Sequence, residues 1–304
     1  MTTTALADSA TMLRRTLKHM LRYPSMTAFM ILMPVGFLLL FVYILGGTVG
    51  ASAHTGRAAY ATFITPGILA LTVVAASTAT AVYVATDMTG GIMARFRTMP
   101  IARVSMLAGH VGRGVIQIVL GIVAVTAVAL LTGFRATASA TGWLAAAGIL
   151  VLFAFALTWL SVALGLAAKS PEAASNLPTP LIILPFLGSG FVLTQTMPTA
   201  VRWFAEYQPF TPVINTVRGL LTGGPIGHNA ILAIAWSLAI TLGSYPVGQE
   251  AVQPRPGTEL SLTHWRRCPP ASSRRGRWRA RAPCHGRTSG TPRCPCASRG
   301  HSPR

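Results

Sequence analysis

The chain has 304 residues, of which 52% are hydrophobic and only 10% are charged, and its mean hydropathy is +0.54. Because a soluble domain carries about 25% charged residues, this composition excludes a soluble enzyme that covers its surface with charge. The formal net charge of +19 divides into +9 on residues 1–245, a cysteine-free apolar body, and +10 on residues 246–304, a short basic tail.

Residues 12–22 predict an amphipathic helix ahead of the long apolar runs. Leucine and methionine recur at helical spacing along one face, and the opposite face is basic. The basic residues are Arg14, Arg15, Lys18 and Arg22. Helices of this kind lie in the headgroup layer of a membrane, although a solvated leader that only adds positive charge stays open as an alternative.

Six runs of the body are long and apolar enough to cross a bilayer, for which a helix needs about 20 residues. They are residues 26–46, 60–86, 114–131, 143–168, 177–197 and 229–245. Lipid offers no partner to backbone N–H and C=O groups, so each run must form a helix. The expected fold is therefore all-α, a polytopic membrane protein with six transmembrane helices.

Lysine and arginine in the short loops predict the orientation of these spans. With a cytoplasmic N-terminus, segments 1–25, 87–113 and 169–176 lie inside and together carry nine Lys and Arg. The outside segments carry four, namely Arg57, Arg135, Arg202 and Arg218. Because positive charge accumulates on the cytoplasmic side, we expect both termini to be cytoplasmic.

The charged residues exclude several kinds of chemistry. Neither Lys18 nor Lys169, the only two lysines, follows a glycine, so the sequence contains no phosphate-binding P-loop. The four carboxylates of the body are scattered and no hydrolase or metalloprotease motif occurs, so we predict no catalytic residue and no metal site. The predicted spans exclude Asp87 and Arg113 and contain no charged residue, which argues against an ion-coupled transporter. The pattern fits a permease driven by a separate ATP-hydrolysing partner.

Two polar residues and a run of small ones fall within or near the predicted spans. Residues 75–81 are mostly small, which lets helices approach closely, within one subunit or between two. His110 and Gln117, near the start of the third span, are interpreted as hydrogen-bonded packing groups rather than ligand contacts.

The loop at residues 87–103 combines arginines with an apolar surface. Ile92, Phe96 and Met99 recur at i, i+4 and i+7 and so share one face of a predicted short helix. Pro100 ends this helix. An exposed apolar face is costly unless a partner covers it, although an ordinary basic loop remains the alternative.

The segment at residues 198–228 is rich in aromatic residues and proline. Trp203, Phe204 and Tyr207 are typical of an aromatic belt at the membrane interface. Apolar residues at helical spacing in 213–221 predict a short helix lying on or dipping into the outer leaflet.

The loop at 87–103 resembles the coupling segment of ABC-2 type permeases, particularly the daunorubicin-resistance-like export permeases. The matching residues are Asp87, Gly91, Ile92, Arg95, Phe96, Arg97, Met99, Pro100 and Arg103. Segments 22–43, 60–69, 169–174 and 197–221 resemble the same family in the same order. The resemblance extends over residues 12–245.

The resemblance implies an ABC-2 permease fold of the type V exporter kind, in the cell membrane and, in bacteria, the inner membrane. Two permease copies would pair as a homodimer among membrane lipids, and each would contact an ABC ATPase on another chain. That ATPase would bind ATP and Mg²⁺, whereas the permease would bind no cofactor and no nucleic acid. The loop at 87–103 would seat on the ATPase, and helix 12–22 would be the family's connecting helix. Residues of an exit-side cap would be Trp203, Phe204, Pro209, Pro212 and Arg218.

The resemblance favours export of a drug-like compound or a hydrophobic metabolite. Two alternatives remain, which are export of a lipid or polysaccharide by the same fold and a membrane scaffold that transports nothing. The predicted spans are plainly aliphatic, which weighs against a sugar.

The tail at residues 246–304 holds 12 arginines, 9 prolines and all four cysteines. It has too few apolar residues to fold alone, and its cysteines lack the paired spacing of a zinc site. Binding to nucleic acid or to anionic lipid is one interpretation. We prefer another, a GC-rich gene read out of frame beyond Tyr245, with Pro246 and Gly248 ending the last helix.

Overall fold

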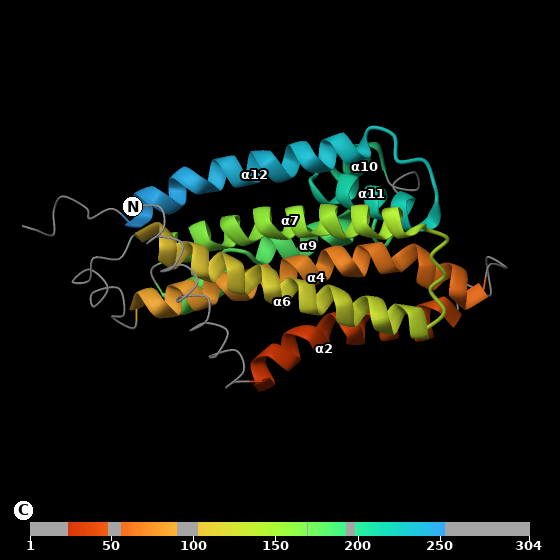
Figure 1. Ribbon diagram of the computed structural model, residues 1–304, viewed down its shortest axis with the longest axis horizontal. Coiled ribbons are helices and arrows are strands. Elements are labelled where there is room, and N and C mark those ends of the chain that lie inside the picture. Colours follow the sequence, from red (N-terminus) through yellow and green to blue (C-terminus); the bar gives the residue numbers. More distant parts are fainter. Residues whose placement is uncertain (1–23, 48–55, 90–102, 169, 193–197, 253–304) are drawn as a thin grey trace, which may run out of the picture. The chain divides into compact units, whose positions relative to one another are not determined.

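The computed structural model describes residues 24–47, 56–89, 103–168, 170–192 and 198–252. These ranges all fall within one compact unit of the chain, Met1–Gln253. Within them the regular secondary structure is entirely helical, and Figure 1 shows the long helices lying side by side as a bundle. The all-α architecture is therefore confirmed for this part of the chain. The connecting helix predicted at 12–22 and the tail beyond residue 252 lie outside the described residues.

Five helices of the described ranges are long and apolar enough to cross a membrane. They are α2 (Pro24–Leu40) with the π-helical turn η1 (Phe41–Leu45), α4 (Gly56–Thr89), α6 (Arg103–Leu131), α7 (Ala140–Ala167) and α12 (Asn229–Val252). Four shorter helices lie between α7 and α12 in the chain. They are α8 (Pro171–Asn176), α9 (Thr179–Leu187), α10 (Thr199–Tyr207) and α11 (Phe210–Thr222).

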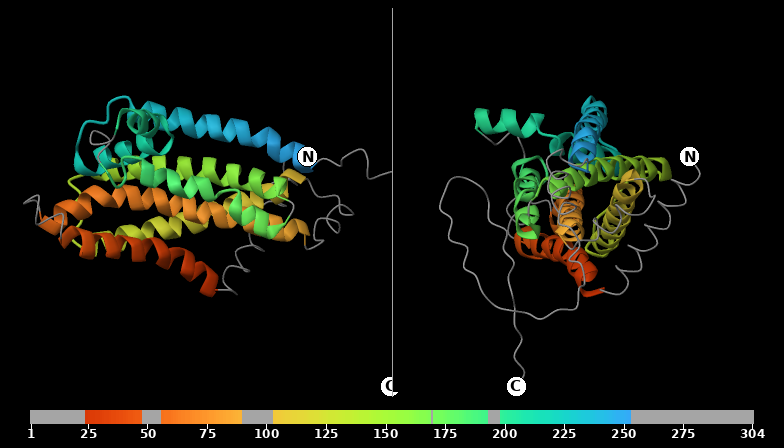
Figure 2. Two further views of the ribbon diagram at one scale, coloured as in Figure 1. Left: turned by 180° about the vertical axis from the view of Figure 1, so that it is seen from behind. Right: turned by 90° about the vertical axis from the view of Figure 1, so that its left-hand side faces the viewer.

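Helix α4 is the centre of the bundle. It packs against α2, α6, α7, α9 and α11, and the end-on view in Figure 2 shows it enclosed by its neighbours. Its Ile64 and Ile68 are fully buried in the same core as Phe153 of α7. A Cβ added to Gly165 of α7 would lie 2.6 Å from the carbonyl oxygen of Ala81. The small residues of the second span thus serve helix packing within one subunit.

The fifth predicted span, residues 177–197, does not form one long helix. Helix α9 covers only nine residues, and a turn follows at 188–192. Nine residues rise about 14 Å as a helix, less than half of a hydrocarbon core about 30 Å thick. Prolines at 178, 180 and 185 and glycines at 188 and 190 interrupt this apolar run. Residues 193–197 lie outside the described ranges, so the number of crossings stays a prediction.

Two other spans are longer than the sequence suggests. The third candidate span begins at Leu107, not at residue 114, and the second extends to Thr89. Both therefore include charged residues, Asp87 and Arg113, that the prediction placed outside the spans. Helices α4 and α6 thus extend beyond the predicted spans, and the position of these two residues relative to the bilayer stays a prediction. Arg113 is 5% exposed and finds its contacts inside the bundle.

The last helix also continues past its predicted end. α12 runs through Pro246 to Val252, whereas Pro246 and Gly248 were expected to end it at Tyr245. A proline within a helix removes one backbone hydrogen bond and bends the axis, but the helix can resume beyond it. The predicted end at Tyr245 is therefore wrong.

Candidate functional site

The C-terminal end of α4 and the N-terminal end of α6 flank residues 90–102. Figure 1 shows these two ends at the same end of the bundle. Of the residues predicted for coupling, Asp87 is described with its side chain, and Arg103 is the first residue of α6. Seven predicted residues lie outside the described ranges, namely Gly91, Ile92, Arg95, Phe96, Arg97, Met99 and Pro100. The same is true of Arg14, Arg15, Lys18 and Arg22, predicted for the connecting helix.

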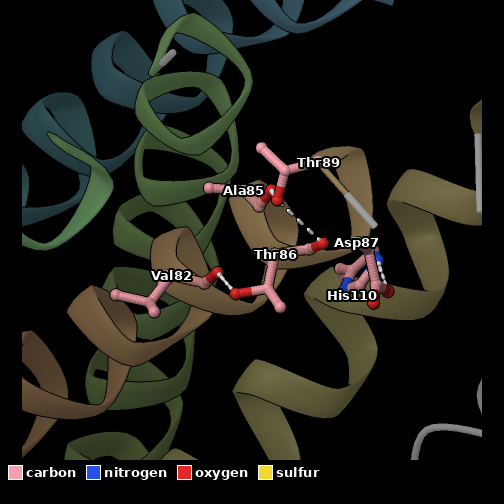
Figure 3. A network of polar contacts seen from close by, with 6 residues as sticks. All are labelled: Val82, Ala85, Thr86, Asp87, Thr89 and His110. Carbon is pink, nitrogen blue, oxygen red and sulfur yellow. Dashed lines mark hydrogen bonds and ion pairs between the residues drawn. The ribbon is translucent and has the colours of Figure 1, made fainter. Parts of the chain in front are cut away.

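Asp87 contacts His110 across the α4–α6 interface. The Nε2 atom of His110 lies 3.3 Å from Oδ2 of Asp87, and the imidazole is almost fully buried whereas the carboxylate is partly exposed. Figure 3 shows this pair in the last turn of α4, where the hydroxyls of Thr86 and Thr89 bond to backbone carbonyl oxygens of their own helix. His110 is buried and in contact through Nε2, as expected of a packing group, and the contact links the two helices beside the 90–102 segment. The expectation that His110 and Gln117 are hydrogen-bonded holds only in part, because Nδ1 of His110 and Nε2 of Gln117 have no partner among the described residues.

A second contact lies one turn further into the bundle. The guanidinium carbon of Arg113 is 3.6 Å from the centroid of the Tyr83 ring, a cation–π geometry. Arg113 forms no ion pair with a carboxylate among the described residues. Gln117, 3% exposed, follows on the same face of α6. The sequence prediction missed this pair, although the i, i+3, i+7 spacing of His110, Arg113 and Gln117 marks a polar helix face.

Buried polar atoms without a partner gather at this interface. They are Nδ1 of His110, Nε of Arg113 and Nε2 of Gln117 on α6, with Oγ of Ser161 on α7. Each such atom costs about 1–3 kcal/mol when it is desolvated without a hydrogen bond. The polar face of α6 is therefore only partly paired by hydrogen bonds among the described residues.

Helix α8 packs against α4 and begins with a side-chain cap. The Ser170 hydroxyl accepts a hydrogen bond from the Ala173 backbone N–H at 3.2 Å, and Pro171 occupies the first turn. Hydrogen bonds from its own backbone N–H and from Ser170 hold the pKa of Glu172 below its usual value. The conformation of α8 is thus determined by the Ser-Pro-Glu sequence that precedes the fifth apolar run.

At the end of the bundle where α4 begins, α11 inserts among α4, α7 and α12. Phe210, Ile214 and Val217 are fully buried, and the Phe210 ring packs edge-on against Phe153, with centroids 5.2 Å apart. The helix expected at 213–221 is present. It lies within the bundle, because its apolar residues pack against three other helices, and its position relative to the outer leaflet stays a prediction.

Arg218 of α11 connects three elements. Its Nη2 donates to the carbonyl oxygen of Ser189 at 2.7 Å and to that of Phe63 at 3.2 Å, and its Nη1 donates to Oδ1 of Asn215 at 3.2 Å. The guanidinium also lies over the Phe63 ring, 4.4 Å from its centroid. Burial lowers the pKa of Arg218 to about 10, so the side chain stays charged at neutral pH.

The other predicted cap residues divide into two groups. Trp203 and Phe204 of α10 are exposed, at 66% and 47%, and the Trp203 ring contacts that of Tyr207 in a tilted arrangement with ring centroids 5.2 Å apart. Pro209 immediately precedes α11, and Pro212 is buried in its first turn. The structure thus brings Pro212 and Arg218 into the bundle and leaves the aromatic pair outside it.

No group of three His, Cys, Asp or Glu that could hold a metal ion occurs among the described residues. The side chains described above connect helices at two opposite ends of the bundle, α4 with α6 at one end and α4 with α11 at the other. Together with five candidate spans, it defines the chain as a multi-pass helical membrane protein.

Comparison with known proteins gives the family. Residues 9–222 match the family model of the ABC-2 type transporter. The daunorubicin resistance ABC transporter permease protein DrrB1 of Streptomyces coeruleorubidus is 31% identical over 223 residues, which cover 72% of this chain and 77% of that protein. The chain therefore belongs to the ABC-2 type transporter family. It is a membrane permease subunit and not itself an enzyme, and the resemblance found in the sequence is confirmed.

Proposed function

We propose that this chain is the permease of an ATP-driven exporter that moves a drug-like compound or hydrophobic metabolite out of the cell. The observation that carries the proposal is the similarity to a daunorubicin resistance permease over most of both chains. The apolar character of the spans supports a lipophilic cargo. ATP hydrolysis takes place on a separate ABC ATPase chain, because the permease sequence contains no P-loop lysine.

The 87–103 segment is the proposed contact with the ATPase. Its two ends belong to α4, the central helix, and to α6, so a displacement of the segment acts directly on the core of the bundle. Two permeases pair, each with one ATPase, and both termini lie in the cytoplasm. In this arrangement helix 12–22 lies along the cytoplasmic membrane surface, and Arg218 belongs to the exit side.

The test is a reconstitution of the permease with the ABC ATPase encoded next to it. Replacing Phe96 by Asp should abolish co-purification of the ATPase and drug-stimulated ATP hydrolysis, because a charge cannot be buried in an apolar contact. Thr98→Asp is the matched control, since it adds the same charge to the loop away from the Ile92–Phe96–Met99 face. If Phe96→Asp behaves like Thr98→Asp, the docking role is wrong. If the wild-type pair moves lipid and no drug, the cargo is a lipid instead.

A further inference from the structure

Two side-chain contacts join α4 to α6 close to the 90–102 segment. Tyr83 and Asp87 are one helical turn apart on α4, and Arg113 and His110 are one turn apart on α6. The helices run antiparallel, so the Tyr83–Arg113 and Asp87–His110 contacts lie one above the other. We call these four residues the α4–α6 clamp.

Below the clamp the two helices are in close contact. A Cβ added to Gly114 would lie 2.7 Å from Oγ1 of Thr80 on α4 and 2.7 Å from Cγ2 of Thr158 on α7. A Cβ added to Gly121 would lie 2.8 Å from Cγ2 of Thr72. At these two positions α6 cannot come closer to α4, whereas this packing does not oppose separation of the two helices at the clamped end.

The Tyr83 ring is the main partner of a buried charge. Arg113 is 5% exposed, its Nε has no hydrogen-bond partner, and its guanidinium lies directly over the ring. Cation–π attraction is strongest where the cation is desolvated, because water no longer competes for it. Separation of α6 from α4 would remove the ring from a cation that has no carboxylate partner among the described residues. The clamp therefore opposes separation of the two helices.

We propose that the α4–α6 clamp makes these two helices move together when the segment between them is displaced, with Tyr83 and Arg113 as positioning residues of energy coupling. The inference rests on the proposed function, since it assumes that the ATPase acts on residues 87–103. Without the clamp, a displacement of that segment would spread the two helix ends and would not reach the core around α4. ATP would then be hydrolysed with little transport.

The experiment measures the number of drug molecules transported per ATP hydrolysed by the reconstituted complex. Tyr83→Leu should lower this ratio about tenfold, the factor that corresponds to roughly 1.4 kcal/mol, while drug binding stays unchanged. Tyr83→Phe is the matched control and should keep the ratio, because it keeps the ring. Tyr83→Leu could instead lower drug binding, ATP hydrolysis and transport by the same factor, while Tyr83→Phe keeps all three. That result would indicate a structural role of the ring and overturn the proposal.

A second series keeps the size of the side chain. Phenylalanine carrying one, two or three fluorines at position 83 weakens the negative ring face stepwise with little change in shape. The transport-to-hydrolysis ratio should fall with each fluorine. A constant ratio across the series would overturn the clamp even if Tyr83→Leu fails to fold. By contrast, a wild-type complex that neither transports nor shows stimulated hydrolysis would refute the proposed function itself.

Discussion

The backbone of Gly190 lies against the backbone of Gly67. A Cβ added to Gly67 would be 2.6 Å from the carbonyl oxygen of Gly190, and one added to Gly190 would be 3.1 Å from the Cα of Gly67. The turn after α9 is thereby seated directly on α4. Arg218 of α11 donates a hydrogen bond to the Ser189 carbonyl oxygen in the same turn. The turn that interrupts the fifth apolar run is therefore in contact with both α4 and α11.

Gly67→Ala should therefore destabilise the protein. The added methyl group meets backbone atoms, which cannot rotate away as a side chain can, and overpacking of this kind costs about 1–3 kcal/mol. Gly148→Ala on α7 is the control, because a Cβ there has nothing within 4 Å. Thermal unfolding in detergent measures both variants. Equal stability of the two alanine variants would contradict the close contact.

Replacement of Arg218 by lysine should also lower stability. A single ammonium group cannot reach the carbonyl oxygens of Phe63 and Ser189 together with Asn215, and an unsatisfied buried acceptor costs about 1–3 kcal/mol. Arg202→Lys is the matched control, since the exposed Arg202–Glu206 pair should contribute less than about 1 kcal/mol. Unfolding midpoints of the two lysine variants report the difference. A loss in Arg202→Lys as large as in Arg218→Lys would refute the special role of Arg218.

The start of α8 should loosen in acid. Glu172 has a lowered pKa in the folded chain, so its contribution to stability is present above the usual glutamate pKa and is lost as pH falls through the lowered value. Hydrogen exchange of the Ala173 backbone N–H should accelerate over this acidic range relative to an unstructured peptide. Glu172→Gln should remove the acid-dependent part of the acceleration, while Ser170→Ala should raise exchange at every pH. Identical pH profiles for Glu172→Gln and the wild type would exclude Glu172 as the titrating group.

The orientation can be tested by labelling single cysteines in a variant whose four natural cysteines are serine. Cysteines that replace Arg57, Arg135 and Arg202 should react with an impermeant reagent added to intact cells, whereas one that replaces Arg97 should react only after lysis. Arg57, Arg135 and Arg202 are exposed in the structure, so their replacement leaves the helix packing intact. Labelling of position 97 in intact cells would invert the predicted topology.

Much of the fold could be predicted from hydropathy, because four of the six apolar runs form large parts of α4, α6, α7 and α12, and a fifth, 26–46, forms α2 and η1. The ends were predicted less well, since α6 begins at Arg103 and α12 ends at Val252. The run at 177–197 could not be predicted in this way, since its mean hydropathy is high although α9 ends at Leu187 with Gly188 as its C-cap. Arg113 lies within α6, whereas the sequence predicts it just outside the third span. A lone arginine is typical of a loop, and the Tyr83 ring that covers it lies 30 positions earlier in the chain, so only the structure shows the contact.

The candidate site was predicted unevenly. Arg218 was chosen by resemblance as a cap residue, but only the structure gives its three acceptors on three elements. Tyr83 was not singled out at all, because one tyrosine in an apolar helix carries no signal of its own. The docking residues from Gly91 to Pro100 remain predictions, as does the role of helix 12–22.

Helix α4 has 34 residues and is therefore about 51 Å long at 1.5 Å per residue. A hydrocarbon core of about 30 Å cannot cover such a rod unless the rod tilts steeply or extends into water. The contact with Gly190 lies about a third of the way along this helix and the clamp lies near its C-terminal end, so a rotation of α4 would displace both contacts at once. Pro66, the one proline in α4, adjoins Gly67, and any bend in the rod would fall there. Such a bend would part α4 from the turn after α9, so a rotation of its C-terminal part would no longer displace the Gly190 contact.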